Sequence, residues 1–276
     1  MTRPRNPRLK KGAKPGFAPF AFVRSWRSSA RGFSALACAM LMSAGAAFAQ
    51  DYQPQMDAFN ASMQSMQNVA GTAAVNAAIN RSLSKRGGAS VASTGSAKPA
   101  KAAAELAFRR DPATTERVRA ALIAAMRQQS KTVADDFARR SAGADYRQRF
   151  ARTLPGQGLS NDNLADIAAY HVAVNWALVH QAPMPAGKAL LALRNQMRGS
   201  FADNGVLAKL APDQRQWVAD DFLFRSLNLA EKVDGFARKP EPQTQTLFAQ
   251  AARDDIRRTL GIDLQGYRFT AEGLVR

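Results

Sequence analysis

The chain has 276 residues, of which 39 are Lys or Arg, 21 are Asp or Glu and one is Cys, and its formal net charge is +18. A single cysteine excludes an intrachain disulfide framework and a zinc site built on several thiolates. The charge is compatible with nucleic acid, lipid phosphates or anionic wall polymers as partners, and it selects none of them.

Residues 1–49 have the three parts of a secretory signal peptide. They contain nine Lys or Arg and no acid, followed by an apolar stretch, and they end in Ala47-Phe48-Ala49. The small residues at the ends of that tripeptide occupy the −3 and −1 positions of a cut before Gln50. The apolar stretch is shorter than the ~20 residues that a membrane-spanning helix needs. We therefore expect general export, cleavage between Ala49 and Gln50, and a periplasmic or secreted protein.

Cleavage would change both the charge and the thiol chemistry of the chain. Removing the leader leaves 30 Lys and Arg against 21 acids, a net charge of +9, and it removes Cys38, the only cysteine. The remaining basic residues are spread along the chain and mostly matched with acids, and no helix-turn-helix or stacking-aromatic motif occurs. We therefore expect no nucleic-acid partner, while weak contacts with anionic envelope polymers remain an open alternative.

Residues 50–83 have a Met-rich apolar pattern that predicts a helix. The apolar positions recur at alternating intervals of three and four residues, as in a helix that packs against a partner helix. These positions, named the seam below, are Met56, Phe59, Met63, Met66, Ala70, Ala73 and Ala77. In one interpretation the helix lies on its own domain. In the other it binds a second copy or another protein through four adaptable side chains, Met56, Phe59, Met63 and Met66.

Residues 84–104 are predicted to form a flexible linker. Ala, Ser, Gly and Lys dominate this stretch, and Val91 is its only larger apolar residue. Such a segment cannot bury enough apolar surface to offset the entropy of ordering it. The remaining residues, 105–276, are long enough for one domain that folds without cross-links.

Helix signals throughout residues 105–276 predict an all-α bundle of about six helices. Asp111 is expected to cap the first helix, with Pro112 at its first position. Ser160 is expected to cap the strongest helix, over about 161–181. The other helices are expected around Val133 and Phe137, past Gly143 towards Phe150, over about 186–198, from Pro212 onward, and over about 243–260. The tail after Gly261 is expected to be irregular or weakly extended.

Two similar segments suggest an internal repeat. Residues 133–141 read VADDFARRS and residues 218–226 read VADDFLFRS, which is compatible with a duplicated helical hairpin over 133–152 and 218–238. Chance resemblance between Ala- and Arg-rich helices is the alternative. Adjacent acids could divide acid and base roles, but neighbouring side chains diverge on a helix. The acids that precede an Arg by four residues, and that we interpret as partners in surface ion pairs, are Asp135, Asp136, Asp221 and Asp254.

No familiar catalytic or metal-binding motif occurs: the sequence lacks an HExxH pair, a Gly-x-Ser-x-Gly elbow and a Gly-rich phosphate loop. The only two histidines, His171 and His180, lie half a turn out of phase on one predicted helix, so they cannot chelate one metal. We therefore expect no metal and no cofactor. His171 shares a helix face with Asn175, and a buried His-Asn pair is the structural interpretation. The functional alternative is a ligand site made of Tyr170, His171, Asn175 and Trp176.

The stretch LPGQGLSNDNLADIAAYHVAVNWAL, followed by a helical region that ends near LGID, resembles uncharacterised exported helical proteins of proteobacteria. The resemblance covers roughly residues 105–276. It implies an exported all-helical protein, and because that group has no assigned activity, it implies no catalytic residue. We therefore expect a non-enzymatic binding or scaffold protein. The alternatives are a cell-envelope hydrolase with an unrecognised site and a basic protein that associates with anionic envelope polymers.

Overall fold

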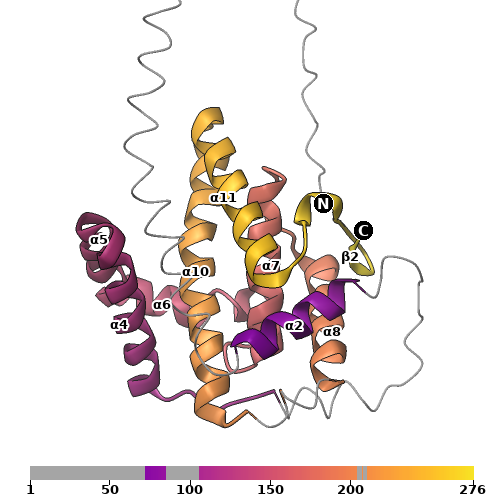
Figure 1. Ribbon diagram of the computed structural model, residues 1–276, viewed down its shortest axis with the longest axis horizontal. Helices are drawn as coiled ribbons and strands as arrows, with labels where there is room; N and C mark the ends of the chain where they lie inside the picture. The colour runs from indigo at the N-terminus through magenta and orange to yellow at the C-terminus, as the bar shows by residue number, and fades with distance from the viewer. Residues whose placement is uncertain (1–71, 85–105, 204–206, 208–209) are drawn as a thin grey trace, which may run out of the picture. The chain divides into compact units, whose positions relative to one another are not determined.

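The computed structural model describes residues 72–84, 106–203, 207 and 210–276 (Figure 1). All of them belong to one compact unit, residues 44–276. The predicted cleavage site at Ala49 and Gln50, the Met-rich part of the predicted N-terminal helix and nearly all of the predicted linker lie outside the described residues.

The described part is all-α apart from one small hairpin, as the sequence predicts. Its helices, in chain order, are α2 (Thr72–Ser84), α4 (Pro112–Gln129), α5 (Lys131–Ala142), α6 (Ala144–Arg152), α7 (Leu164–Val179), α8 (Gly187–Ala202), α10 (Pro212–Arg238) and α11 (Pro242–Leu260) (Figure 1). Among the described residues no helix is long and apolar enough to cross a membrane.

Helix α7 is the centre of the core. All of its residues except Trp176 are buried, and it contacts α8, α10 and α11. A helix that is apolar on every side is stable only where other elements cover it all round. The sequence correctly predicts a helix in this stretch. Its neighbours α8, α10 and α11 form the layer around it.

The start of α7 differs from the prediction. The N-cap is Asn163, whose Oδ1 accepts hydrogen bonds from the backbone N–H groups of Ala165 and Asp166 at 3.0 and 3.3 Å. The Ser160 hydroxyl instead accepts from the N–H of Asp162 at 3.1 Å, in the turn before the helix. The backbone of Leu164 also donates to Leu106 at 3.1 Å. This long-range bridge holds the turn extended and delays the helix.

Local signals place the ends of several other helices correctly. Asp111 caps α4, accepting from the N–H groups of Ala113 and Thr114 at 3.1 and 3.0 Å, with a proline at the first helical position. Helix α10 begins at Pro212, as predicted, and runs for 27 residues. Helix α11 ends before Gly261, whose φ of 68° is the left-handed conformation typical of a helix C-terminus.

The tail is more ordered than the sequence predicts. Strands β1 (Arg268–Thr270) and β2 (Gly273–Val275) pair as an antiparallel hairpin in which Phe269 lies opposite Leu274. Gly273 has a φ of 112°, a conformation that other residues rarely adopt. The hairpin packs on α8 and buries Leu274 completely, and this burial explains why so short a pair of strands forms.

The structure contradicts the hypothesis of an internal duplication and favours the alternative of chance resemblance. Residues 133–152 form two helices, α5 and α6, separated at Gly143, whose backbone is extended. Residues 218–238 lie within the single uninterrupted helix α10. The packing differs as well, because Asp135 and Asp136 are 40% and 44% exposed whereas their counterparts on α10 are buried. The shared letters therefore occupy non-equivalent positions.

Candidate functional site

His171, on α7, is buried against α10. Its imidazole is 2% exposed and stacks on the ring of Phe222 with centroids 4.6 Å apart. Its Nδ1 lies 3.0 Å from the hydroxyl of Ser226, and that hydroxyl donates to the Phe222 carbonyl at 2.6 Å. The hydroxyl oxygen is thus left to accept, and this contact fits the tautomer that carries its proton on Nδ1. Burial, with a smaller contribution from Arg225, lowers the pKa of His171 to about 3.

The four residues singled out on this helix do not meet at one place. Asn175 is buried and its Nδ2 donates to the His171 carbonyl at 2.9 Å. Tyr170 is 2% exposed, and burial raises its pKa. Trp176 lies elsewhere, with its Nε1 donating to the Tyr267 carbonyl at 2.8 Å. His171 and Asn175 are therefore both buried and hydrogen-bonded to each other. A ligand role for these four residues stays a prediction.

Buried acids of α10 and α11 each pair with an arginine of their own helix. Asp221 accepts from Nε of Arg225 at 2.8 Å, and the two side chains are only 4% and 5% exposed. The predicted pair is therefore formed, but its predicted surface position is wrong, because both side chains are buried. Arg258 pairs with Asp255 at 2.9 Å instead of with Asp254, which accepts from Gln250. Burial raises the pKa of Asp255 and of Asp221.

The neighbouring carboxylate on α10 points to a different helix. Asp220 forms an ion pair with Arg110 and accepts from the Thr115 hydroxyl at 2.7 Å and from Gln216 at 3.1 Å. These bonds fasten the start of α4 to α10. Asp220 and Asp221 therefore diverge, as expected for adjacent residues on a helix, and they do not present two carboxylates to one substrate atom.

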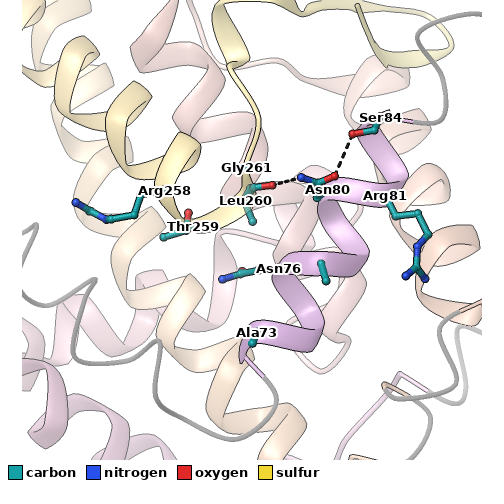
Figure 2. Close-up of a pocket in the computed structure, with 10 residues that line it drawn as sticks. Ala73, Asn76, Asn80, Arg81, Ser84, Arg258, Thr259, Leu260 and Gly261 are labelled. Carbon is teal, nitrogen blue, oxygen red and sulfur yellow. Dashed lines mark hydrogen bonds between the residues drawn. The ribbon is translucent and has the colours of Figure 1, made fainter.

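A cleft of about 830 Å³ lies between α2 and the end of α11 (Figure 2). Asn80 of α2 donates to the Leu260 carbonyl and so caps α11, and the Ser84 hydroxyl donates to Asn80 at 3.0 Å. A Cβ on Gly261 would lie 2.9 Å from Nδ2 of Asn80. The side chain of Asn76 lines the cleft, is 8% exposed, and its Oδ1 has no hydrogen-bond partner among the described residues.

Helix α2 has two distinct faces. Its core face is buried against α8 and α11 and consists of Val75, Ala78, Ile79 and Leu83. The last two seam residues, Ala73 and Ala77, are exposed and line the cleft. The helix thus lies on its own domain through residues outside the seam. The seam residues from Met56 to Ala70 lie outside the described residues.

A second hollow was not predicted. This groove of about 710 Å³, named the α5–α10 groove below, is formed by α4, α5, α10 and α11. Its apolar lining consists of Met126, Val133, Phe137, Leu229 and Phe248, and its charged lining consists of Asp135, Asp136, Arg139, Arg140, Glu231 and Lys232. The lining residues come from four separate stretches of sequence, so no local pattern indicates them. Nowhere in the described ranges do three or more His, Cys, Asp or Glu residues gather as a metal site would require.

The described residues form an all-α protein whose polar core groups are buried. Its surface carries the cleft beside α2 and the α5–α10 groove. The chain belongs to a family of unknown function, DUF6683, whose model matches residues 30–276. The expected membership of an uncharacterised family is therefore confirmed, over a longer stretch than the resemblance covers. No curated protein and no solved structure matches the chain.

Proposed function

We propose that the protein is an exported, non-enzymatic scaffold that self-associates through the seam. The observation that carries this proposal is the division of α2 into two faces. Ala73 and Ala77 are exposed, while the opposite side of the same helix is buried on the protein. A second copy can therefore contact Ala73 and Ala77 without undoing the packing of α2.

Helical geometry extends the argument to the Met-rich residues. Met66 precedes Ala73 by seven residues and Met63 precedes Ala77 by fourteen, which correspond to about two and four turns of an α-helix. If the helix continues towards the N-terminus, these side chains share the exposed face of α2. Covering one Met or Phe side chain contributes roughly 1.5–3 kcal/mol. Four such side chains from each copy supply enough apolar surface for a stable pair of helices.

The polar interior supports a non-enzymatic role. The groups best suited to acid–base chemistry, His171, Asp221 and Asp255, are each no more than 3% exposed. Their hydrogen bonds and ion pairs are made with other parts of the protein, at Ser226, Arg225 and Arg258. A substrate would have to displace packed helices to reach them. Their arrangement fits a role in stability and specificity of the fold.

Export is supported by the leader in residues 1–49, with its basic stretch, apolar stretch and small residues before Gln50. Cleavage there leaves the seam close to the new N-terminus. It also leaves a chain without cysteine, suited to an oxidising compartment. We propose a folded helical domain outside the cytoplasm, with an N-terminal helix through which two copies bind each other.

Sedimentation velocity of the chain that begins at Gln50 tests the proposal. Ala77→Glu places a charge on the exposed seam face of α2, and Ala120→Glu is the matched control on an exposed face of α4. Met63→Glu is likewise paired with Gln64→Glu, about 100° away on a helix. We expect the seam variants to weaken self-association at least tenfold, since burying an unpaired charge costs more than the about 1.4 kcal/mol of a tenfold change. A monomeric wild-type chain, or equal effects of seam and control variants, would contradict the proposal.

A further inference from the structure

Along α2, the cleft beside the end of α11 is lined mainly by small side chains. Ala73 and Ala77 are exposed there, one helical turn apart, and Asn80 follows on the same side of the helix (Figure 2). The opposite wall is the end of α11, from Arg258 to Gly261. The cleft volume is about 830 Å³, so larger side chains from another chain have room beside the two alanines.

The seam has its large and its small residues at opposite ends. Its first four residues are Met or Phe, and its last three are Ala. Two parallel helices in register place large residues against large ones and alanine against alanine, which leaves the cleft beside Ala73 and Ala77 unfilled. Two antiparallel helices place the large residues of one copy against the small residues of the other. Facing large and small side chains interdigitate and pack densely, so the antiparallel direction is favoured.

The charges of the cleft and of the N-terminal segment are complementary. None of the described residues that line the cleft is acidic. Arg81 is exposed and forms no ion pair with another described residue, whereas Arg258 is bound to an acid of its own helix. Residues 50–71 contain Asp51 and Asp57 and no Lys or Arg. An antiparallel pair brings this acidic stretch of one copy towards Arg81 of the other, whereas a parallel pair sets the two acidic stretches side by side.

We propose that the two copies pair antiparallel, with large seam residues of each copy in the cleft between α2 and α11 of the other and its acidic stretch beside Arg81. The spacing of the seam sets Phe59 of one copy opposite Ala77 of the other. Met63 then lies opposite Ala73. Each contact occurs twice, because such a pair is two-fold symmetric. The inference rests on the proposed self-association and adds the surface that receives the second copy and the direction in which it binds.

Disulfide cross-linking of two single-cysteine variants, Met63→Cys and Ala73→Cys, tests the direction on the chain that begins at Gln50. One variant carries a mass tag, so that a non-reducing gel separates mixed dimers from dimers of one variant. The antiparallel pair should give cross-links in the mixture and few in either variant alone. Positions 63 and 73 are about 15 Å apart along a helix, and the Cα atoms of a disulfide are only ~4.4–6.8 Å apart. A parallel pair therefore gives the reverse pattern.

Sedimentation velocity of Arg81→Glu tests the charge contact, with Arg147→Glu on an exposed position of α6 as the matched control. We expect Arg81→Glu to weaken the pair about tenfold, because two-fold symmetry applies the reversed charge twice. Arg147→Glu makes the same change in net charge and should leave the affinity as in the wild type.

The outcomes separate this inference from the self-association on which it rests. A single cysteine at Met66 lies near the centre of the pair in either direction, so its cross-link reports pairing alone. Where the wild type forms dimers, three results would overturn the antiparallel arrangement by itself: cross-links within each variant, no cross-link in the mixture, or equal effects of the two charge reversals. A monomeric wild type would overturn the proposed function and this inference together.

Discussion

Acidification should destabilise the fold through His171. In the folded chain, burial lowers the pKa of this imidazole to about 3, whereas its ordinary pKa is 6.5. Between these two values the unfolded chain binds a proton that the folded chain does not bind. The stability associated with neutral His171 is therefore present in full above about pH 6.5 and is lost as the pH falls towards 3.

The size of the effect follows from the same two values. Each pH unit below the unfolded pKa costs about 1.4 kcal/mol, so moving from pH 7 to pH 5 removes roughly 2 kcal/mol through this one residue. The result depends little on the folded pKa, provided that it stays well below 5. Its physical basis is the enclosure of the ring by Phe222 and Ser226.

Urea unfolding at pH 7 and pH 5, measured on the wild type and on His171→Leu, isolates this contribution. Buried carboxylates such as Asp221 also change protonation as the pH falls, but they are common to both proteins. We expect the wild type to lose about 2 kcal/mol more than the variant between the two pH values. Equal losses in the two proteins would refute the neutral, buried state of His171.

Three further predictions concern the buried ion pair, the end of α11 and the leader. Arg225→Met should lower the free energy of unfolding by about 3–5 kcal/mol in urea titrations, because it leaves the buried carboxylate of Asp221 without its cation; a change below 1 kcal/mol would contradict the buried ion pair. Gly261→Ala should lower the thermal midpoint because of the positive φ and the 2.9 Å approach to Asn80, whereas Gly199→Ala, with open space at its Cβ, should raise it slightly. Intact-mass measurement of the protein recovered from the periplasm should give a chain that begins at Gln50; a retained leader would contradict the export proposal.

Much of the fold could be predicted because short-range signals decide where helices start and stop. Asp111 before Pro112, the proline at 212 and the glycine at 261 act through bonds within one helical turn. The start of α7 could not be predicted in this way. There the backbone pairing of Leu106 with Leu164 favours Asn163 over Ser160 as the cap, and that contact spans 58 positions of the chain.

Spacing predicts only part of the ion pairing. Asp136 pairs with Arg140 and Asp221 with Arg225, as expected, whereas Asp135 pairs with Arg127 and Lys131 instead of Arg139, and Asp254 accepts from Gln250. The interval of four residues correctly pairs Asp221 with Arg225, yet it carries no information on how deeply the rest of the protein buries them. The same limitation applies to the hypothesis of a duplication, since the letters that the two segments share occupy an exposed face of α5 and a buried stretch of α10. The α5–α10 groove was missed for a related reason: its lining residues come from four separate stretches of sequence and meet only in the folded chain.

Cysteine cross-linking in the oxidising periplasm tests the central claim most directly, because it requires both export and pairing through the seam. Single cysteines are introduced in a chain that loses its own Cys38 with the leader, at Met63, Met66, Ala73 or Ala77, with Gln64→Cys and Ala120→Cys as controls. The account predicts disulfide-linked dimers on a non-reducing gel for at least one seam position and for neither control. Monomers at all four seam positions, or equal dimer formation by the controls, would contradict it.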